Sequence, residues 1–204
     1  CFADDVRFCP FHGKELRSFE ALAPGALEGT QLGGHKLERF LRRDAFGDVY
    51  RASRKRTQLA LRVLHPQLVL DVERSRQNLN ELRKLKTAVH PSVVRVPAAK
   101  REDSGLCFVA QEWVEGSTLR ELLAAQPRVE ARQAVALVRL CLDALQGLHE
   151  LGVYHGTLAA ERIFVERADN GRRIVRLADA GLFAFIATES PDEVSEEHDV
   201  SKPE

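Results

Sequence analysis

The chain of 204 residues contains no methionine, even at position 1, and has only one tryptophan, two tyrosines and four cysteines. Its longest uninterrupted apolar run, 182–187, is far too short to span a bilayer. No charged-then-apolar leader opens the chain, so nothing in it resembles a secretory signal. We therefore expect a processed chain or an excerpt of a longer protein, with no membrane segment in this part.

Neither sign of charge is in excess, because 30 lysines and arginines balance 30 aspartates and glutamates. Without a net positive field, the composition argues against nucleic acid as a partner. Hydrophobic residues make up 44% and charged residues 29%, which is typical of a globular protein. Charge is uneven only in 189–204, where seven acidic residues accompany one lysine. Such a stretch is typical of a solvated loop.

The four cysteines fall into two groups. Cys107 and Cys141 lie in apolar runs, which predicts buried, reduced thiols and favours a cytoplasmic location. Residues 1–18 contain Cys9 and His12 in a CPFH turn that resembles one knuckle of a zinc ribbon, and Cys1 could end a preceding knuckle. These three residues cannot close a four-ligand site, so zinc is expected only in the parent protein. The alternative is an ordinary turn.

Hydrophobic patterning becomes dense from about Lys36. Residues 19–35, rich in glycine with one proline, predict a linker. Period-two runs predict strands over 48–52, 59–64, 93–97, 106–114, 163–166 and 174–178. Helical spacing predicts helices over 72–88, 118–125 and 129–151, the last apolar on more than one face and therefore buried. A strand-led part followed by a helix-led part indicates an α+β fold with two lobes.

Five segments occur in the order of a known signature. They read LRRDAFGDVYRA over 41–52, LALR over 59–62, FVAQEWVEG over 108–116, HGTLAAERIF over 155–164 and LADAGL over 177–182. Together they resemble the motifs of a protein kinase of the bacterial serine/threonine type. The resemblance implies a protein kinase-like two-lobed fold, with a β-rich N-lobe over 36–114. It also implies a partial helical C-lobe over 115–204, ending in an acidic tail like an activation segment.

The resemblance also implies where ATP and Mg²⁺ would bind. Of the three glycines in the phosphate-binding loop only one is present, and the phosphate-pairing lysine is replaced by arginine. The helix glutamate that pairs with this cation is present, so we expect an ion pair between Arg62 and Glu81. The implied cofactor residues are Gly47, Val49, Ala60, Arg62, Glu81, the hinge residues Glu112 and Val114, and the metal ligand Asp179.

The catalytic-loop segment keeps the residues that support the fold in this family and lacks those that take part in phosphoryl transfer. Thr157 replaces the aspartate that accepts the proton of the attacking hydroxyl, and a threonine hydroxyl cannot be that base near neutral pH. Arg162 replaces the asparagine that holds a metal ion and brings positive charge to that position. Loss of a positioned general base costs a factor of about 10²–10⁴ in rate. No intact catalytic set is therefore expected.

Three readings of function follow from these losses. The first is a pseudokinase that acts in signalling by binding a protein partner, by scaffolding or by allosteric control, with nucleotide binding that is weak or absent and largely independent of Mg²⁺. The second is an atypical active kinase that relies on Asp179 and a substitute base. The third is a zinc-ribbon-linked interaction module with the acidic tail as a docking surface.

Overall fold

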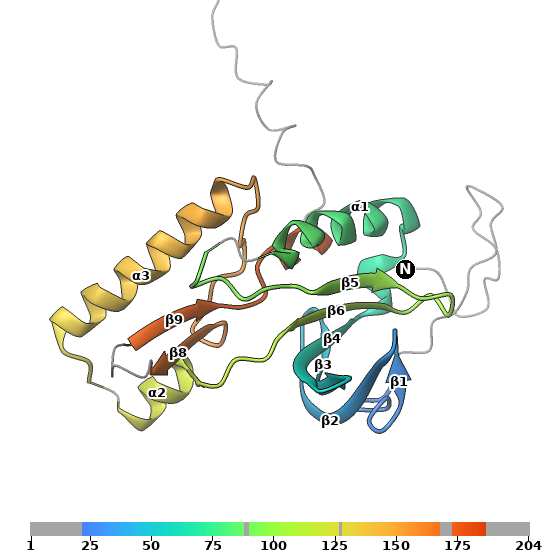
Figure 1. Cartoon of the computed structure of the whole chain (residues 1–204), viewed down its shortest axis with the longest axis horizontal. Helices are drawn as coiled ribbons and strands as arrows, with labels where there is room; N and C mark the ends of the chain where they lie inside the picture. Colours follow the sequence, from blue (N-terminus) through green and yellow to red (C-terminus); the bar gives the residue numbers. More distant parts are fainter. Residues whose placement is uncertain (1–21, 88–89, 127, 168–172, 187–204) are drawn as a thin grey trace, which may run out of the picture.

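The structure is a computed structural model and describes residues 22–87, 90–126, 128–167 and 173–186. Figure 1 shows a strand-rich lobe beside a lobe that carries helix α3, with the chain crossing between them after β6. This α+β arrangement confirms the predicted two-lobed, kinase-like fold. The predicted zinc-ligand residues Cys1, Cys9 and His12 lie outside the described residues, as does the acidic stretch 189–204.

The N-lobe is built on an antiparallel sheet of six strands. The strands lie in the order β1-β2-β3-β4-β6-β5. Their apolar side chains, including Leu37, Tyr50, Leu61 and Phe108, pack together inside the curled sheet. The strands span Gln31–Leu32 (β1), His35–Asp44 (β2), Gly47–Arg54 (β3), Thr57–Leu64 (β4), Ala98–Arg101 (β5) and Cys107–Glu112 (β6).

The N-lobe begins earlier than the sequence indicates. The predicted linker, 19–35, is folded onto this lobe over its described residues and contains β1. The buried carboxylate of Asp48 accepts a hydrogen bond from the Gly25 backbone N–H at 3.1 Å, and the Arg43 guanidinium donates to the Leu22 carbonyl at 2.7 Å. These contacts fix a glycine-rich segment that local sequence alone would leave free.

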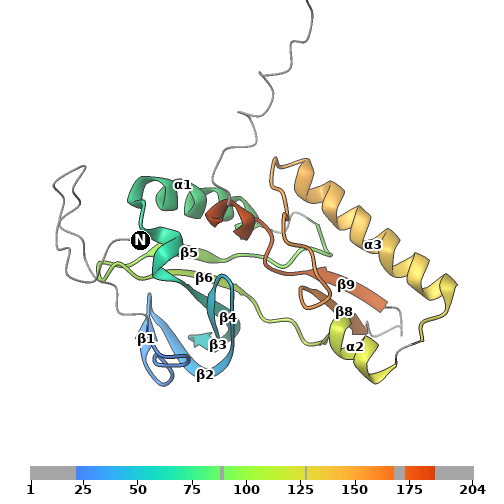
Figure 2. The ribbon, with the colours of Figure 1, turned by 180° about the vertical axis from the view of Figure 1, so that it is seen from behind.

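Helix α1, Val72–Leu82, packs against β5 in the N-lobe (Figure 2). The Asp71 side chain caps it by accepting from the Arg74 N–H at 2.9 Å, and Leu79 and Leu82 are buried at helical spacing. The predicted helix over 72–88 ends as an α-helix at Leu82 and continues as a 3₁₀ turn, Arg83–Lys86 (η2). Another 3₁₀ turn, Pro66–Val69 (η1), precedes α1.

Residues 93–97 form no strand, contrary to the prediction. Val93 makes a single parallel bridge to Leu177, and the Val94 N–H donates to the Leu177 carbonyl at 2.9 Å. The Val96 N–H instead donates to Leu85, and the Arg95 carbonyl accepts from Glu112. The segment thus satisfies its backbone through three different elements and links the two lobes.

The second lobe pairs a small sheet with two α-helices. Its strands, Ser117–Thr118 (β7), Ile163–Arg167 (β8) and Arg173–Leu177 (β9), lie in that order, and the turn Leu182–Phe185 (η3) follows β9. Helix α2, Leu119–Ala125, starts with a capping box between Thr118 and Glu121. Side chains from both lobes, including Leu64, Leu82, Leu148 and Leu182, share one continuous core.

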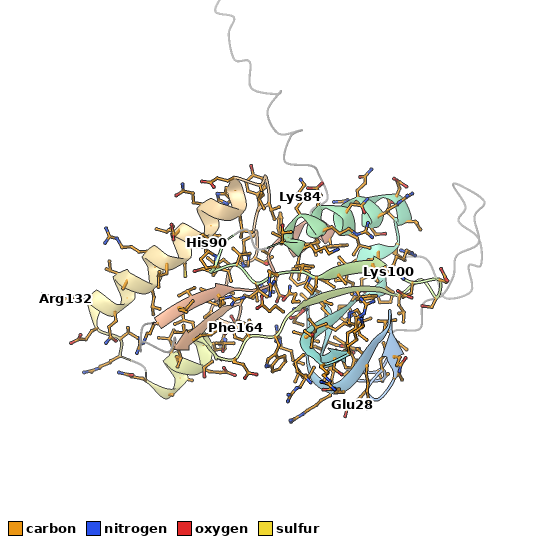
Figure 3. All side chains as sticks on the ribbon, in the orientation of Figure 1. Glu28, Lys84, His90, Lys100, Arg132 and Phe164 are labelled. Atoms are coloured by element: carbon orange, nitrogen blue, oxygen red, sulfur yellow. The ribbon has the colours of Figure 1, made fainter. Side chains whose placement is uncertain are left out.

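Helix α3, Ala131–His149, is only partly covered, which corrects the prediction that it is buried. Cys141, Ala144 and Leu148 face the core. On the other face Val135 and Leu142 are each 58% exposed among the described residues. Figure 3 labels Arg132 near the start of this open face. No helix in the described part of the chain has the length and hydrophobicity of a membrane span.

Candidate functional site

Arg62 lies at the junction of the two lobes, on the face of β4 that it shares with Ala60. Only 3% of its side chain is exposed. Its Nη2 donates to Asp179 Oδ2 at 2.8 Å, and its Nη1 donates to Asp44 Oδ1. Asp44 ends β2 and Asp179 follows β9, so one guanidinium joins three segments that are far apart in the chain.

Two further arginines surround the same carboxylates. Arg42 Nη2 lies 3.7 Å and Arg162 Nε lies 3.6 Å from Asp179 Oδ2, and Arg42 Nε also lies 3.6 Å from Asp44 Oδ2. We call these five residues, Arg42, Asp44, Arg62, Arg162 and Asp179, the interlobe ion cluster. Three cations and two anions leave it with one net positive charge.

Ion pairing stabilises the charged forms inside this cluster. Burial alone would raise the pKa of Asp44, but the Arg62 guanidinium outweighs it and holds that pKa below its usual value. Burial alone would likewise lower the pKa of Arg62, yet Asp179 and Asp44 raise it. Asp44 and Arg62 are therefore both charged near neutral pH, and each of the three arginines already lies next to a carboxylate of the chain itself.

Phe46 lies at the tip of the β2–β3 hairpin and points into the space between the lobes. It is 2% exposed. The guanidinium carbons of Arg62 and Arg162 lie 5.8 and 5.2 Å from its ring centroid, within cation–π range. The hairpin turns at Gly47, where φ is 148° and an added Cβ would lie 1.9 Å from the Val63 carbonyl oxygen. The tight turn and the buried ring together close the hairpin over the ion cluster.

A cavity of about 330 Å³ lies beside the ion cluster, between the lobes; we call it the cleft cavity. The N-lobe contributes Val49 and Ala60, while Phe164 of β8, labelled in Figure 3, and Ala178 come from the second lobe. The crossing segment after β6 forms one wall, and Arg42 and Asp179 lie at the end next to the ion cluster. The remaining lining residues are Leu41, Val94, Gln111, Glu112, Trp113, Val114, Gly116, Thr118 and Glu121.

Two polar groups on this wall have no partner within the described part of the chain. Gln111 is 6% exposed, and no hydrogen bond between described residues involves its side-chain amide. The backbone of Val114 likewise makes no hydrogen bond to another described residue. By contrast, Glu112 accepts from Arg95 at 3.0 Å and from Arg176 at 2.9 Å, and the hydrogen bond from Arg95 is the main cause of its lowered pKa. Gln111 and Val114 are thus available to a ligand.

His155 and Thr157, two of the catalytic-loop residues, lie next to the ion cluster and supply no charged acid or base. Arg162 donates to the Thr157 carbonyl, while the Thr157 hydroxyl is buried without a partner among the described residues. Both ring nitrogens of His155 are also buried and unpartnered there. Burial lowers the pKa of His155, so the ring is neutral. At the position of Thr157 there is thus no carboxylate to take a proton from a substrate hydroxyl.

Glu81 does not pair with Arg62, contrary to the expectation. Its carboxylate contacts Lys84 on the outer surface of α1, and its side chain is 56% exposed. Figure 3 shows Lys84 at this outer edge. Arg62 pairs instead with Asp44, which was not among the predicted site residues. The sequence features that could have indicated this pairing are the carboxylate of Asp44 at the end of β2 and the aromatic ring of Phe46 two positions later.

The structure brings together most of the predicted cofactor residues. Val49, Ala60, Glu112, Val114 and Asp179 line the cleft cavity. The metal position of Asp179 does not fit Mg²⁺, because its carboxylate faces three guanidinium groups. Nor do any three histidine, cysteine, aspartate or glutamate side chains gather as a metal site within the described ranges.

Comparison with known families agrees with this geometry. Residues 35–202 match the family model described as "Protein tyrosine and serine/threonine kinase". A solved structure of the Mycobacterium tuberculosis PknI kinase domain is similar, with a TM-score of 0.66 and 25% sequence identity. That match covers 79% of this chain and 64% of the solved one.

Curated relatives are similar over part of their length. Serine/threonine-protein kinase PknD of Mycobacterium tuberculosis is 31% identical over 143 residues, covering 69% of this chain and 21% of the relative. Serine/threonine-protein kinase pkn2 of Myxococcus xanthus is 28% identical over 139 residues, covering 68% and 16%. CBL-interacting protein kinase 21 of Oryza sativa subsp. japonica is 26% identical over 171 residues, covering 83% and 32%. The chain thus spans a third or less of these relatives.

Proposed function

The chain belongs to the protein tyrosine and serine/threonine kinase family, and we propose that it is a pseudokinase within that family. It acts in signalling by binding a protein partner, as a scaffold or an allosteric element, and does not transfer phosphate. The observation that carries this proposal is the interlobe ion cluster, in which three arginines surround the one carboxylate left at the metal position.

The chemical reason is electrostatic. Phosphoryl transfer depends on metal ions and positioned cations that stabilise charge on the transferring group. Here the Arg162 guanidinium lies 3.6 Å from the carboxylate at the position where a metal would be held, and Arg62 is neutralised by two carboxylates. Thr157 supplies no base. Among the described residues, the metal site, the free phosphate-pairing cation and the proton acceptor are therefore all missing.

The folded architecture supports a binding role. The continuous core through both lobes, the capped helices and the linking segment 93–97 are all present although the reacting groups are not. An exposed apolar stripe on α3 adds surface that a partner could cover, and interaction surfaces often carry such patches. Besides Asp179, two carboxylates line the cleft cavity: Glu112 accepts from Arg95 and Arg176, and Glu121 caps α2. Neither is free to act as the substitute base that an atypical enzyme would need.

A phosphotransfer assay tests the proposal. The full chain, incubated with γ-labelled ATP, Mg²⁺ or Mn²⁺ and a generic protein substrate, is expected to label neither itself nor the substrate above background. The Thr157→Asp/Arg162→Asn double variant checks whether the missing groups alone account for the inactivity. Labelling by the wild-type chain that disappears in Asp179→Asn would instead establish an atypical kinase.

A further inference from the structure

We propose that a basic pocket on the N-lobe binds an acidic peptide segment of a protein partner. The β3–β4 hairpin, the η2 turn and the segment 95–98 form most of this pocket. The inference rests on the proposed function in one respect, because it names a surface and a chemistry for the protein partner. It does not depend on whether the chain transfers phosphate.

The basic pocket is a hollow of about 350 Å³ on the face of β4 that points away from the cleft cavity. Leu59 lines the basic pocket, whereas Ala60, the next residue of β4, lines the cleft cavity. Successive residues of a strand point to opposite faces of the sheet, so the two hollows lie on opposite sides of β4. The lining residues of the basic pocket are His35, Arg54, Lys55, Thr57, Gln58, Leu59, Lys86, Arg95, Pro97, Ala98 and Glu112.

Positive charge dominates this lining. It contains four cations and one carboxylate, and that carboxylate, Glu112, pairs with Arg95 at 3.0 Å. The other three cations are Arg54, Lys55 and Lys86, and none of them lies within ion-pair distance of a carboxylate among the described residues. The pocket therefore offers three cations to an anionic ligand without breaking an ion pair of the chain.

The β3–β4 hairpin fixes two of these cations at the rim of the pocket. Arg54 and Thr57 are paired residues at the end of the ladder, and Lys55 follows in the turn with a φ of 57°. Glycine or asparagine is the usual residue in this left-handed region, so the turn holds a charged side chain at some conformational cost. Arg54 lies against the preceding turn, because a Cβ added at Gly34 would lie 4.0 Å from Arg54 Nε.

The apolar part of the lining indicates what accompanies the anionic groups. Leu59 is 5% exposed, and Pro97 and Ala98 line the same hollow. An aliphatic side chain of a ligand would bury apolar surface against these three residues, while carboxylates on either side of it reach the cations. Exposed ion pairs contribute little singly, so recognition depends on several of them together. This pattern fits a peptide in which acidic residues flank an aliphatic one.

The same lining argues against a nucleic acid or a lipid surface as the ligand. Its one aromatic ring, His35, is 1% exposed and therefore offers no face on which a base can stack. None of the exposed large apolar side chains in the described part of the chain belongs to the pocket, so nothing there would insert into a bilayer. An acidic peptide is the ligand class that remains.

Fluorescence anisotropy of labelled peptides titrated with the full chain tests the inference. The probe carries two glutamates on each side of a leucine, and the control peptide has glutamines in their place. The acidic peptide is expected to bind about tenfold more tightly than the control, and to weaken as salt screens the charges. No binding of the acidic peptide, or equal binding of the two, would overturn the inference. Tighter binding of a single-stranded oligonucleotide or of phosphatidylserine vesicles would overturn the ligand class.

A double variant tests the named residues. Lys55→Asn removes a charge and suits the left-handed backbone, and Lys86→Gln removes a second charge from an exposed position. Together they are expected to weaken binding of the acidic peptide about tenfold, or about threefold for each exposed charge. The control is Arg132→Gln/Arg139→Gln, which removes two charges from exposed positions of α3 and should leave binding unchanged. Equal effects of the two double variants would contradict the location of the site.

The two proposals fail in different ways. A chain that neither transfers phosphate nor binds the acidic peptide leaves the pseudokinase intact and overturns the basic pocket. Phosphotransfer by the wild-type chain overturns the pseudokinase, whatever the peptide does. The peptide titration therefore tests the surface separately from the catalytic question.

Discussion

Arg62 and Asp179 are 117 positions apart in the chain, and their side chains meet at 2.8 Å between the two lobes. Asp44 holds the same guanidinium from the end of β2, so the pair is part of a three-residue contact rather than an isolated bridge. This contact occupies the place where a kinase of this family would hold the phosphates and the metal. It explains both the expected inactivity and the closure of the cleft.

Arg62→Ala is expected to lower the free energy of unfolding by about 3 kcal/mol, because it leaves a buried carboxylate without its main partner. Arg42 and Arg162 remain near Asp179 and keep the loss from being larger. Urea unfolding measures the effect, with Arg76→Ala at an exposed position of α1 as the control. Equal stability of the two variants would show that the ion cluster contributes nothing to folding.

Phe46→Ala is expected to cost about 3–5 kcal/mol, the usual range for removing a fully buried aromatic side chain. Phe183→Ala removes the same atoms from a residue that is 40% exposed and should cost less than half as much. Thermal or urea unfolding of both variants makes the comparison. A similar loss in the two would mean that Phe46 does not hold the hairpin closed.

Gly47→Ala is expected to disrupt the β2–β3 hairpin. The new Cβ would lie 1.9 Å from the Val63 carbonyl oxygen, which belongs to a paired strand and cannot move aside easily. Gly29→Ala is the matched control, because it shares a positive φ but has nothing within 4 Å. We expect a loss of about 1 kcal/mol for Gly29→Ala and a much larger one for Gly47→Ala, measured by urea unfolding.

Stability is expected to fall as the pH is lowered from 7 toward 5. Burial lowers the pKa of His155, so the unfolded chain binds a proton that the folded chain does not. The contribution is complete above the unfolded pKa of about 6.5 and is lost as the pH falls toward the folded pKa, with a slope of up to about 1.4 kcal/mol per pH unit. Burial also lowers the pKa of His35, which adds a slope of the same sign.

Urea unfolding at a series of pH values measures this slope. His155→Asn should make it shallower, while His149→Asn, at the exposed end of α3, should leave it unchanged. A slope that is the same in all three proteins would contradict the role of His155.

Magnesium is expected not to tighten ATP binding. Asp179 faces three guanidinium groups, and a divalent cation would have to displace them. Titrations of ATP with and without Mg²⁺ should give dissociation constants within twofold of each other. A tenfold gain with Mg²⁺ would show that the ion cluster opens to admit the metal.

Local sequence patterns determined most of the secondary structure and the order of the motifs. The predicted strands over 59–64 and 163–166 and the predicted helix over 129–151 coincide closely with β4, β8 and α3. The spacing of apolar residues and the capping of helices depend only on nearby positions in the chain. They can therefore be recognised in the sequence without knowledge of distant contacts. The resemblance to the kinase signature likewise depends on spacing along the chain.

The predictions that α3 is buried and that 93–97 forms a strand were wrong for the same reason. An apolar helix is buried only where another element covers it, and Val135 and Leu142 have no such cover among the described residues. A short apolar segment becomes a strand only where a neighbour offers a continuous ladder, and Val93 finds a single bridge. Both outcomes depend on what lies beside the segment in space.

The sequence by itself determined the kinase-like frame and which chemical positions were replaced. Only the tertiary structure decided that Arg62 pairs with Asp44 and Asp179 rather than with Glu81, and that Phe46 lies between two guanidinium groups. The physical reason is that a buried charge takes the nearest carboxylates that desolvation and packing leave within reach. Asp44 and Asp179 lie close to Arg62 because β2, β4 and the segment after β9 converge in the folded chain. The spacing of these residues along the sequence does not predict that convergence.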